Sequence, residues 1–164
     1  MINIFRKKAD QNRLDLTVKS PLKGKKINLD DIDDPLFSGE ALGKTVAIYP
    51  ENGKVLSPVN GRIVTLFETK HAIALISESG VEILIHIGID TVKLEGKPFK
   101  AFVENNQKVK VGDKLIEFDL NQITTHNLSP VTLIVICNTN KYQRIESSVG
   151  VNINELDEIM VAYE

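Results

Sequence analysis

Short apolar stretches separated by glycine and proline are the feature that most limits how this chain can fold. Turn-forming residues recur from Gly39 to Gly112, and between them lie stretches of strand length that are rich in β-branched residues. These stretches are Thr45–Tyr49, Arg62–Phe67, Ala72–Ile76, Val81–Ile87 and Lys114–Phe118. Many short strands between tight turns are typical of antiparallel sandwiches and small barrels. The sequence therefore predicts an all-β fold, a compact antiparallel β-sandwich.

The pattern predicts only short helical turns. Residues 120–127 could form one or two turns that end before Ser129-Pro130, and residues 154–159 have weak helical character. Between them, the stretch Val131–Cys137 contains almost no polar side chain, which predicts a central strand of a sheet.

Length and composition favour one folded domain. With 164 residues, of which 42% are hydrophobic, the chain can build one well-buried core. Residues 1–30 are rich in Lys, Asp and Asn, so we expect a polar tail there with one possible edge strand, Leu14–Val18. The single β-sandwich domain is then expected to span residues 31–164.

Charge and cysteine content exclude several classes of protein. The 20 Lys and Arg residues are balanced by 22 Asp and Glu residues, and 5% of residues are aromatic, so nucleic acid is not an expected partner. No stretch approaches the roughly 18 apolar residues of a transmembrane helix. Cys137 is the only cysteine, which favours a reducing, cytoplasmic location.

Two further segments hint at an internally duplicated unit. Residues 54–64 and 104–116 resemble the two halves of a lipoyl or biotinyl hybrid barrel, each with a glycine, Gly61 or Gly112, at a tight reversal. A swinging-arm carrier needs a lysine at a hairpin tip, and the tip Ser77–Gly80 has none. The duplicated hybrid-barrel motif therefore bears on the fold and not on the function.

Two histidines lie on the predicted hairpin formed by residues 71–86. If its loop has two or four residues, every cross-strand pair of residue numbers sums to 157, and His71 lies directly opposite His86. Both side chains then project from one face. A loop with an odd number of residues would instead place them on opposite faces.

Two facing imidazoles permit two kinds of chemistry. One neutral histidine can act as a nucleophile while the other donates an N–H to a transferred group. Alternatively, His71 and His86 could bind zinc with Asp90 or Glu82 as a third ligand. That second arrangement would be a zinc hydrolase of the lysostaphin-like hybrid-barrel class, although such sites use a His-x-His pair and the strand here supplies only His86.

Several motifs in order resemble one known family. They are Ser57–Gly61, Phe67–Ala72, Ser79–Glu82, His86–Val92 and Lys108–Asp119, within a region from Asp34 to Asn138. Together they resemble the glucose-type IIA component of the bacterial phosphoenolpyruvate-dependent sugar phosphotransferase system. The resemblance implies an antiparallel β-sandwich with a shallow active site and a phosphotransferase activity that proceeds through a phosphohistidine.

The same resemblance implies roles for individual residues. His86 would be phosphorylated at Nε2, His71 would hold the phosphoryl group, and Thr69 would orient His71. Independently of the resemblance, Gly88 beside His86 has no side chain and would let a partner's backbone or a phosphoryl group approach. A docking surface around this site would consist of the carboxylates Asp34 and Asp90 and an apolar ring of Leu36, Phe37, Ala41, Leu42, Phe67 and Val92.

The resemblance also implies the partners. A histidine phosphocarrier protein would donate the phosphoryl group, and a cysteine of the IIB domain of a sugar permease would receive it, which couples sugar uptake to phosphorylation. Regulated permeases or glycerol kinase could dock on the same surface. No cofactor is required for this transfer, and a zinc ion shared by His71, His86 and a partner's carboxylate is compatible with it.

Overall fold

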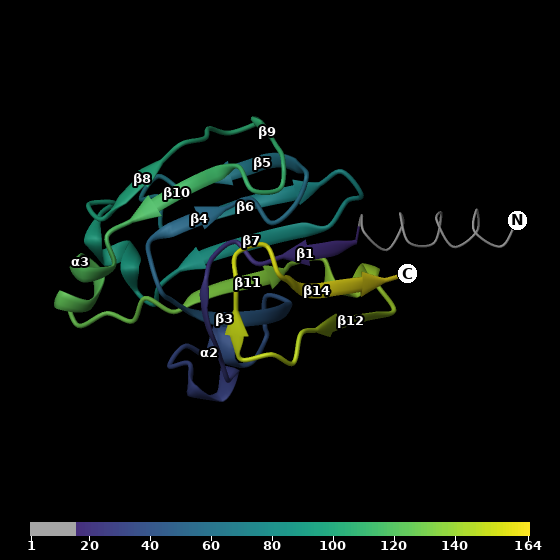
Figure 1. Ribbon diagram of the computed structural model, residues 1–164, viewed down its shortest axis with the longest axis horizontal. Coiled ribbons are helices and arrows are strands. Elements are labelled where there is room, and N and C mark those ends of the chain that lie inside the picture. The colour runs from purple at the N-terminus through teal and green to yellow at the C-terminus, as the bar shows by residue number, and fades with distance from the viewer. Residues whose placement is uncertain (1–15) are drawn as a thin grey trace, which may run out of the picture.

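Three antiparallel β-sheets contain most of the regular secondary structure in the computed structural model, which describes residues 16–164 (Figure 1). The strands are β1 (Thr17–Lys19), β2 (Gly24–Ile27), β3 (Lys44–Pro50), β4 (Lys54–Leu56), β5 (Gly61–Leu66), β6 (Ala72–Ser77), β7 (Glu82–Ile87), β8 (Phe99–Ala101), β9 (Lys108–Val109), β10 (Lys114–Phe118), β11 (Thr132–Ile136), β12 (Arg144–Ser147), β13 (Asn152–Ile153) and β14 (Glu158–Tyr163). The helical segments are short: η1 (Leu29–Asp31), α2 (Pro35–Ser38), η2 (Thr91–Leu94), α3 (Leu120–Thr125) and η3 (Thr139–Lys141).

The largest sheet has eight strands in the order β13-β2-β3-β11-β7-β6-β5-β9. Two three-stranded sheets, β4-β10-β8 and β1-β14-β12, accompany it. Among residues 16–164, no helix is long and apolar enough to cross a membrane.

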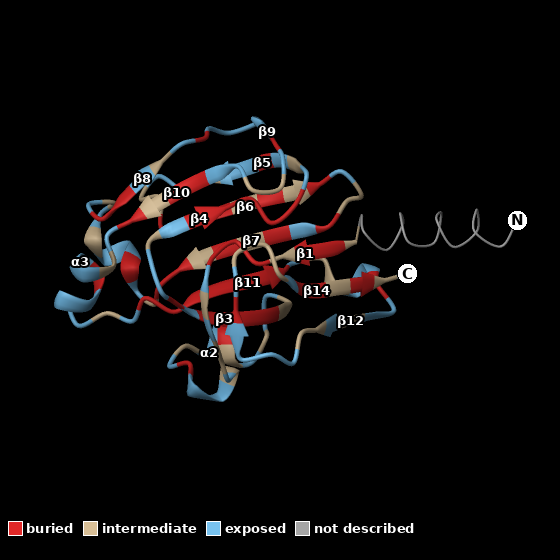
Figure 2. Cartoon of the chain, in the orientation of Figure 1, coloured by how far each residue is buried: buried red, intermediate tan, exposed pale blue. Residues whose placement is uncertain are grey.

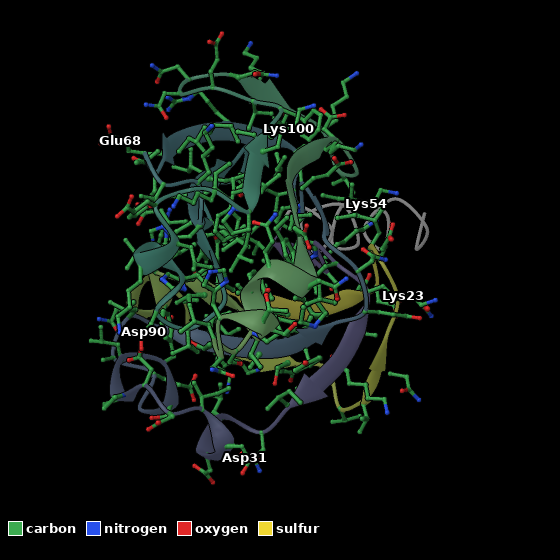
Figure 3. The ribbon with its side chains drawn as sticks, turned by 90° about the vertical axis from the view of Figure 1, so that its left-hand side faces the viewer. Lys23, Asp31, Lys54, Glu68, Asp90 and Lys100 are labelled. Carbon is green, nitrogen blue, oxygen red and sulfur yellow. The ribbon has the colours of Figure 1, made fainter. Side chains whose placement is uncertain are left out.

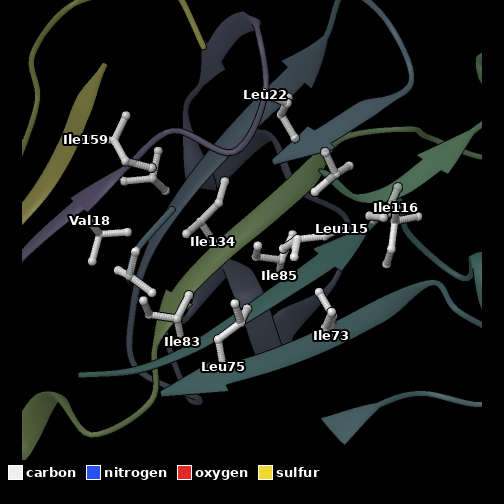
Figure 4. Packing of buried hydrophobic residues seen from close by; sticks show 14 of the residues in the cluster. Val18, Leu22, Ile73, Leu75, Ile83, Ile85, Leu115, Ile116, Ile134 and Ile159 are labelled. Atoms are coloured by element: carbon white, nitrogen blue, oxygen red, sulfur yellow. The ribbon is translucent and has the colours of Figure 1, made fainter. Parts of the chain in front are cut away.

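The main hydrophobic core joins the large sheet to the two smaller sheets. It contains Ile134 from β11 and Ile85 from β7, together with Leu115 from β10 and Ile159 from β14 (Figure 4). Since successive side chains of a strand alternate between faces, this packing makes the protein a β-sandwich.

A second, smaller core covers the opposite face of the large sheet. Leu133 and Val135 of β11 pack there against Ile32 and Phe37, which come from the segment that contains η1 and α2. Strand β11 is therefore buried on both faces, and Figure 2 shows its uniform burial. This explains why the stretch contains almost no polar side chain and confirms the prediction of a central strand.

Most sequence predictions of secondary structure are confirmed. The five predicted strands correspond to β3, β5, β6, β7 and β10, and the helical turn predicted for residues 120–127 corresponds to α3. The helix predicted for residues 154–159 is wrong. Asn154 N–H donates to the Asp157 carboxylate at 2.8 Å in a turn, and β14 begins at Glu158. Pairing of β14 with both β1 and β12 outweighs the weak local helical preference.

The folded part of the chain begins earlier than the expected boundary at residue 31. Strand β1 pairs with β14 at the edge of a sheet, close to the expected edge strand 14–18, and β2 pairs with β3 and β13. Residues 1–15 of the expected tail lie outside the described residues.

The two segments that suggested a hybrid barrel lie side by side in the structure. Strand β4 pairs with β10, and β5 pairs with β9, so each part of the first segment contacts a part of the second. This arrangement agrees with the predicted antiparallel β-sandwich.

Candidate functional site

The hairpin that carries the two histidines has a register one residue away from the predicted one. Its loop has three residues, 78–80, because Ser77 N–H donates to the Val81 carbonyl at 2.9 Å. Cross-strand pairs therefore sum to 158, so His86 lies opposite Ala72, and His71 lies opposite Ile87. By this register alone, the two side chains should point to opposite faces.

The two imidazoles nevertheless meet, because His71 lies outside the regular strand. Strand β6 begins only at Ala72, and the turn before it contains Lys70 with a left-handed φ of +57°. This turn carries the His71 ring to the face on which His86 projects. The ring centroids are 5.0 Å apart and the rings are nearly perpendicular, at 83°. The prediction of adjacent imidazoles thus agrees with the structure, but the loop of two or four residues from which it was made is wrong.

One hydrogen bond determines the chemical state of His86. Its Nδ1 lies 2.8 Å from the carbonyl oxygen of Gly88. A carbonyl oxygen can only accept a hydrogen bond, so Nδ1 carries the hydrogen atom and Nε2 of the neutral ring has a free lone pair. The hydrogen bond therefore leaves Nε2 as the ring nitrogen that is free to act as a nucleophile.

His71 is held by a different partner. Its Nδ1 lies 2.5 Å from the Thr69 hydroxyl, which can donate to it because a hydroxyl has both a hydrogen atom and lone pairs. In that arrangement the hydrogen atom of the neutral His71 ring is on Nε2. Phe67 packs edge-on against the ring at 5.6 Å, and His71 is only 7% exposed.

Phe37 occupies a different position from the rest of the expected apolar ring. It is 4% exposed and its ring lies 5.0 Å from that of His86. The side chain belongs to the second core, so its contact with a partner can only be small. Phe37 instead packs against the imidazole of His86.

The other apolar residues of the expected docking surface are exposed. Leu36 is 54% exposed, and Val92 is 49% exposed. Leu42 and Phe67 are each 39% exposed, and Ala41 also lies at the surface. Exposed large apolar side chains are typical of docking surfaces. Ala41 and Leu42 lie with Cys137 and Thr139, beyond the Ile136 end of β11.

Burial lowers the pKa of both histidines. The pKa of His71 is lowered from 6.5 to about 4, first by burial and second by the charge of His86. Burial also lowers the pKa of His86, although the Gly88 carbonyl and the charges of Asp34 and Asp90 oppose this effect. Neutral imidazoles are therefore favoured at neutral pH, as nucleophilic chemistry requires.

The two predicted carboxylates lie within electrostatic reach of His86. Asp34 caps the N-terminus of α2, where its carboxylate accepts from Leu36 N–H at 3.0 Å. Asp90 has a left-handed φ of +60° and lies at the surface, 3.8 Å from the Lys93 ammonium (Figure 3). Both carboxylates add negative charge beside an otherwise apolar site.

Gly88 is required by its surroundings as well as by its backbone. Its φ is +80°, and an added Cβ would lie 2.3 Å from Thr91 Cγ2 and 2.8 Å from the Ser129 carbonyl oxygen. Thr91 lies within the motif His86–Val92, but the sequence pattern predicts no role for it. Its only signal was a polar residue three positions after the glycine.

The described residues do not support the predicted zinc-hydrolase alternative. Among residues 16–164, no group of three or more His, Cys, Asp or Glu side chains could hold a metal ion. Glu82, one suggested ligand, lies opposite Ile76 at the other end of β7 from His86. The third histidine, His126, is exposed at the end of α3, where its Nδ1–H donates to the Gln122 carbonyl at 2.6 Å.

This combination of an antiparallel sandwich and two facing, neutral imidazoles defines a class of protein that transfers groups through histidine. Comparison with known proteins makes the class specific. Residues 16–142 match the family described as phosphoenolpyruvate-dependent sugar phosphotransferase system, EIIA 1. The chain belongs to this family, and it is a phosphotransferase component that carries phosphoryl groups in sugar uptake.

Individual relatives agree with the family match. The chain is 50% identical over 135 residues to the PTS system glucose-specific EIIA component of Bacillus cereus, which covers 82% of each chain. It is 47% identical over 127 residues to the glucosamine-specific EIICBA component of Bacillus subtilis, covering 77% of this chain and 20% of that protein. The solved structure of glucose permease IIA from Mycoplasma capricolum superimposes with a TM-score of 0.83 at 37% identity, covering 89% of this chain and 94% of the other.

Replacing Gly88 with alanine should destabilise the protein by about 2 kcal/mol or more, because backbone strain and overpacking add together. The matched control is Gly112→Ala. Gly112 has a φ of +90°, but the atom nearest to its added Cβ is 3.5 Å away, so only the strain of about 1 kcal/mol applies. Urea unfolding at neutral pH measures both changes. Equal losses of stability would show that the contact between the added Cβ and Thr91 does not destabilise the protein.

Stability should fall as the pH drops from about 6.5 toward about 4. In that window the unfolded chain binds a proton at His71 that the folded protein does not bind, which lowers the free energy of unfolding by about 1.4 kcal/mol per pH unit. Above it, His71 is neutral in both states and contributes no slope. Urea unfolding across the window should show a shallower slope for His71→Gln. The control is His126→Gln, which removes an exposed imidazole. A wild-type slope in His71→Gln would contradict the lowered pKa of His71.

Proposed function

We propose that Nε2 of His86 is the atom that receives the phosphoryl group. The observation that carries this proposal is the hydrogen bond from Nδ1 to the Gly88 carbonyl, because it leaves the Nε2 lone pair free. The donor is a phosphorylated histidine phosphocarrier protein. In the transfer, the Nε2–P bond forms as the P–N bond of the donor breaks, and the donor imidazole leaves with the electron pair of that bond.

His71 stabilises the group that is transferred. With Thr69 donating to its Nδ1, the Nε2–H of His71 can donate to a phosphoryl oxygen on the neighbouring ring. His71 remains neutral at neutral pH because of its lowered pKa, so it acts as a hydrogen-bond donor and not as a cation. In the onward step, a cysteine thiolate of a IIB domain attacks phosphorus, and the bond to Nε2 breaks.

The surface around His86 is suited to both partners in turn. The exposed side chains of Leu36, Leu42, Phe67 and Val92, with Ala41, supply apolar contact. Asp34 and Asp90 supply negative charge that attracts basic groups of a partner. A shallow, preformed surface allows two different proteins to reach one histidine.

The same surface suits regulatory docking, because a phosphoryl group on His86 would change the charge at its centre. Regulated permeases or glycerol kinase are candidate partners. A zinc ion could bridge His71, His86 and a partner's carboxylate, since two imidazoles leave two positions of a tetrahedral site open. The phosphoryl transfer itself needs no cofactor.

The lone, exposed Cys137 supports a cytoplasmic location, where thiols remain reduced.

The variant His86→Ala should accept no phosphate. Incubation with phosphoenolpyruvate and the upstream phosphotransferase proteins should add one acid-labile phosphoryl group to the wild-type chain, which intact mass spectrometry detects. His126→Ala is the matched control and should be labelled normally, because His126 lies on α3 outside the site. Acid-labile labelling of His86→Ala would overturn the proposal.

The variant His71→Gln should still accept phosphate but pass it on slowly. Loss of the Nε2–H donor is expected to reduce the rate of transfer to a IIB domain by about 100-fold, the usual cost of removing one stabilising donor. Rapid-quench measurement of labelled protein after mixing with a purified IIB domain gives this rate. Wild-type onward transfer in His71→Gln would remove His71 from the mechanism.

A further inference from the structure

Thr91 is a buried polar residue with no role in the site as described so far. It is completely buried, and its hydroxyl donates to the carbonyl of Ile87, the residue between His86 and Gly88. Its methyl carbon, Cγ2, occupies the space where a Cβ on residue 88 would lie. Thr91 therefore contacts the backbone on which the His86 hydrogen bond depends.

The backbone after His86 leaves the regular sheet and is fixed by separate contacts. Gly88 N–H donates to the Val131 carbonyl at 3.0 Å, and Ile89 N–H donates to the Ser129 carbonyl at 2.9 Å. The peptide group between Ile87 and Gly88 is thus held at its N–H by Val131 and at its carbonyl by Thr91. The next peptide group presents the Gly88 carbonyl to His86.

We propose that Thr91 is a positioning residue for phosphoryl transfer, because its hydroxyl fixes the Ile87–Gly88 peptide and thereby aims the Gly88 carbonyl at Nδ1 of His86. Without that hydroxyl, the peptide keeps its N–H contact with Val131 but loses the contact at its carbonyl, so the Gly88 carbonyl is aimed less firmly at Nδ1 of His86 and their hydrogen bond weakens. The fraction of rings with the lone pair on Nε2 then falls. Thr91 acts only through this backbone and does not touch the transferred group. The inference rests on the proposed role of His86 as the acceptor.

Replacing Thr91 with valine tests this inference, since valine keeps the shape of threonine and removes the hydroxyl. Two quantities are measured on the full chain: the His86 tautomer from ¹⁵N chemical shifts of the imidazole, and the rate of phosphoryl acceptance from the phosphorylated histidine phosphocarrier protein. Thr91→Val should increase the fraction of the Nε2–H tautomer. It should also slow acceptance about five- to tenfold, the value of one hydrogen bond.

Two further variants separate positioning from general stability. Thr91→Ser keeps the hydroxyl and should retain the wild-type tautomer. If Thr91→Val does not fold, Thr91→Ser is still available for the tautomer measurement. Thr45→Val is the matched control, because Thr45 is likewise buried and donates to a backbone carbonyl, that of Gly43 at 2.9 Å, outside the site. It should change neither quantity.

The outcomes distinguish the two proposals. A wild-type tautomer and rate in Thr91→Val, an altered tautomer in Thr91→Ser, or equal effects of Thr91→Val and Thr45→Val would each overturn the role of Thr91. If the wild-type chain takes no phosphate on His86, the proposed function fails. The tautomer comparison would still decide whether Thr91 orients this ring.

Discussion

The site depends on the burial of the central strands from both sides. Strand β7 pairs with β11, where His86 lies opposite Leu133, and β11 pairs in turn with β3. One face of these strands packs in the main core and the other in the second core. Because both faces are covered, the backbone that carries His86 cannot shift without disturbing two sets of packed side chains. The strand segment that carries His86 is therefore rigidly supported.

Two turns at the ends of strands then determine where the His86 and His71 side chains point. At the end of β7, the left-handed conformation of Gly88 turns its carbonyl toward His86. Before β6, the left-handed Lys70 turns His71 out of its expected alternation and brings Thr69 to its Nδ1. Such conformations cost free energy in residues other than glycine and are often found at functional sites. Two turns at adjacent strand ends thus position both imidazoles.

The sequence predicted the sheet content well, because short apolar stretches between glycines have few alternatives to antiparallel strands. It failed at β14, where pairing on both edges outweighs a weak helical pattern. The predicted contact between the two histidines is present, but the even-numbered loop from which it was predicted is not. The loop length fixes the register of β6 and β7, whereas the direction of the His71 side chain depends on the turn before β6. A residue outside the strand is directed by its turn, and a turn with Lys70 at positive φ has no clear sequence signal. Phe37 was likewise expected in the exposed apolar ring, because the family resemblance implied that position, but its side chain is buried against His86.

The lowered pKa values of the histidines follow from the same packing, and they suit the proposed acceptance and release of a phosphoryl group at one site. Phe37 and Phe67 shield the imidazoles from water, which disfavours their cationic forms. A neutral His86 can attack phosphorus, whereas a protonated ring has no lone pair to offer. In the proposed mechanism, a neutral His71 offers one hydrogen bond and no full positive charge, so it would stabilise the phosphoryl group without binding it strongly. A carrier needs this balance, because a group bound more strongly in its resting state than in the transition state would be released slowly.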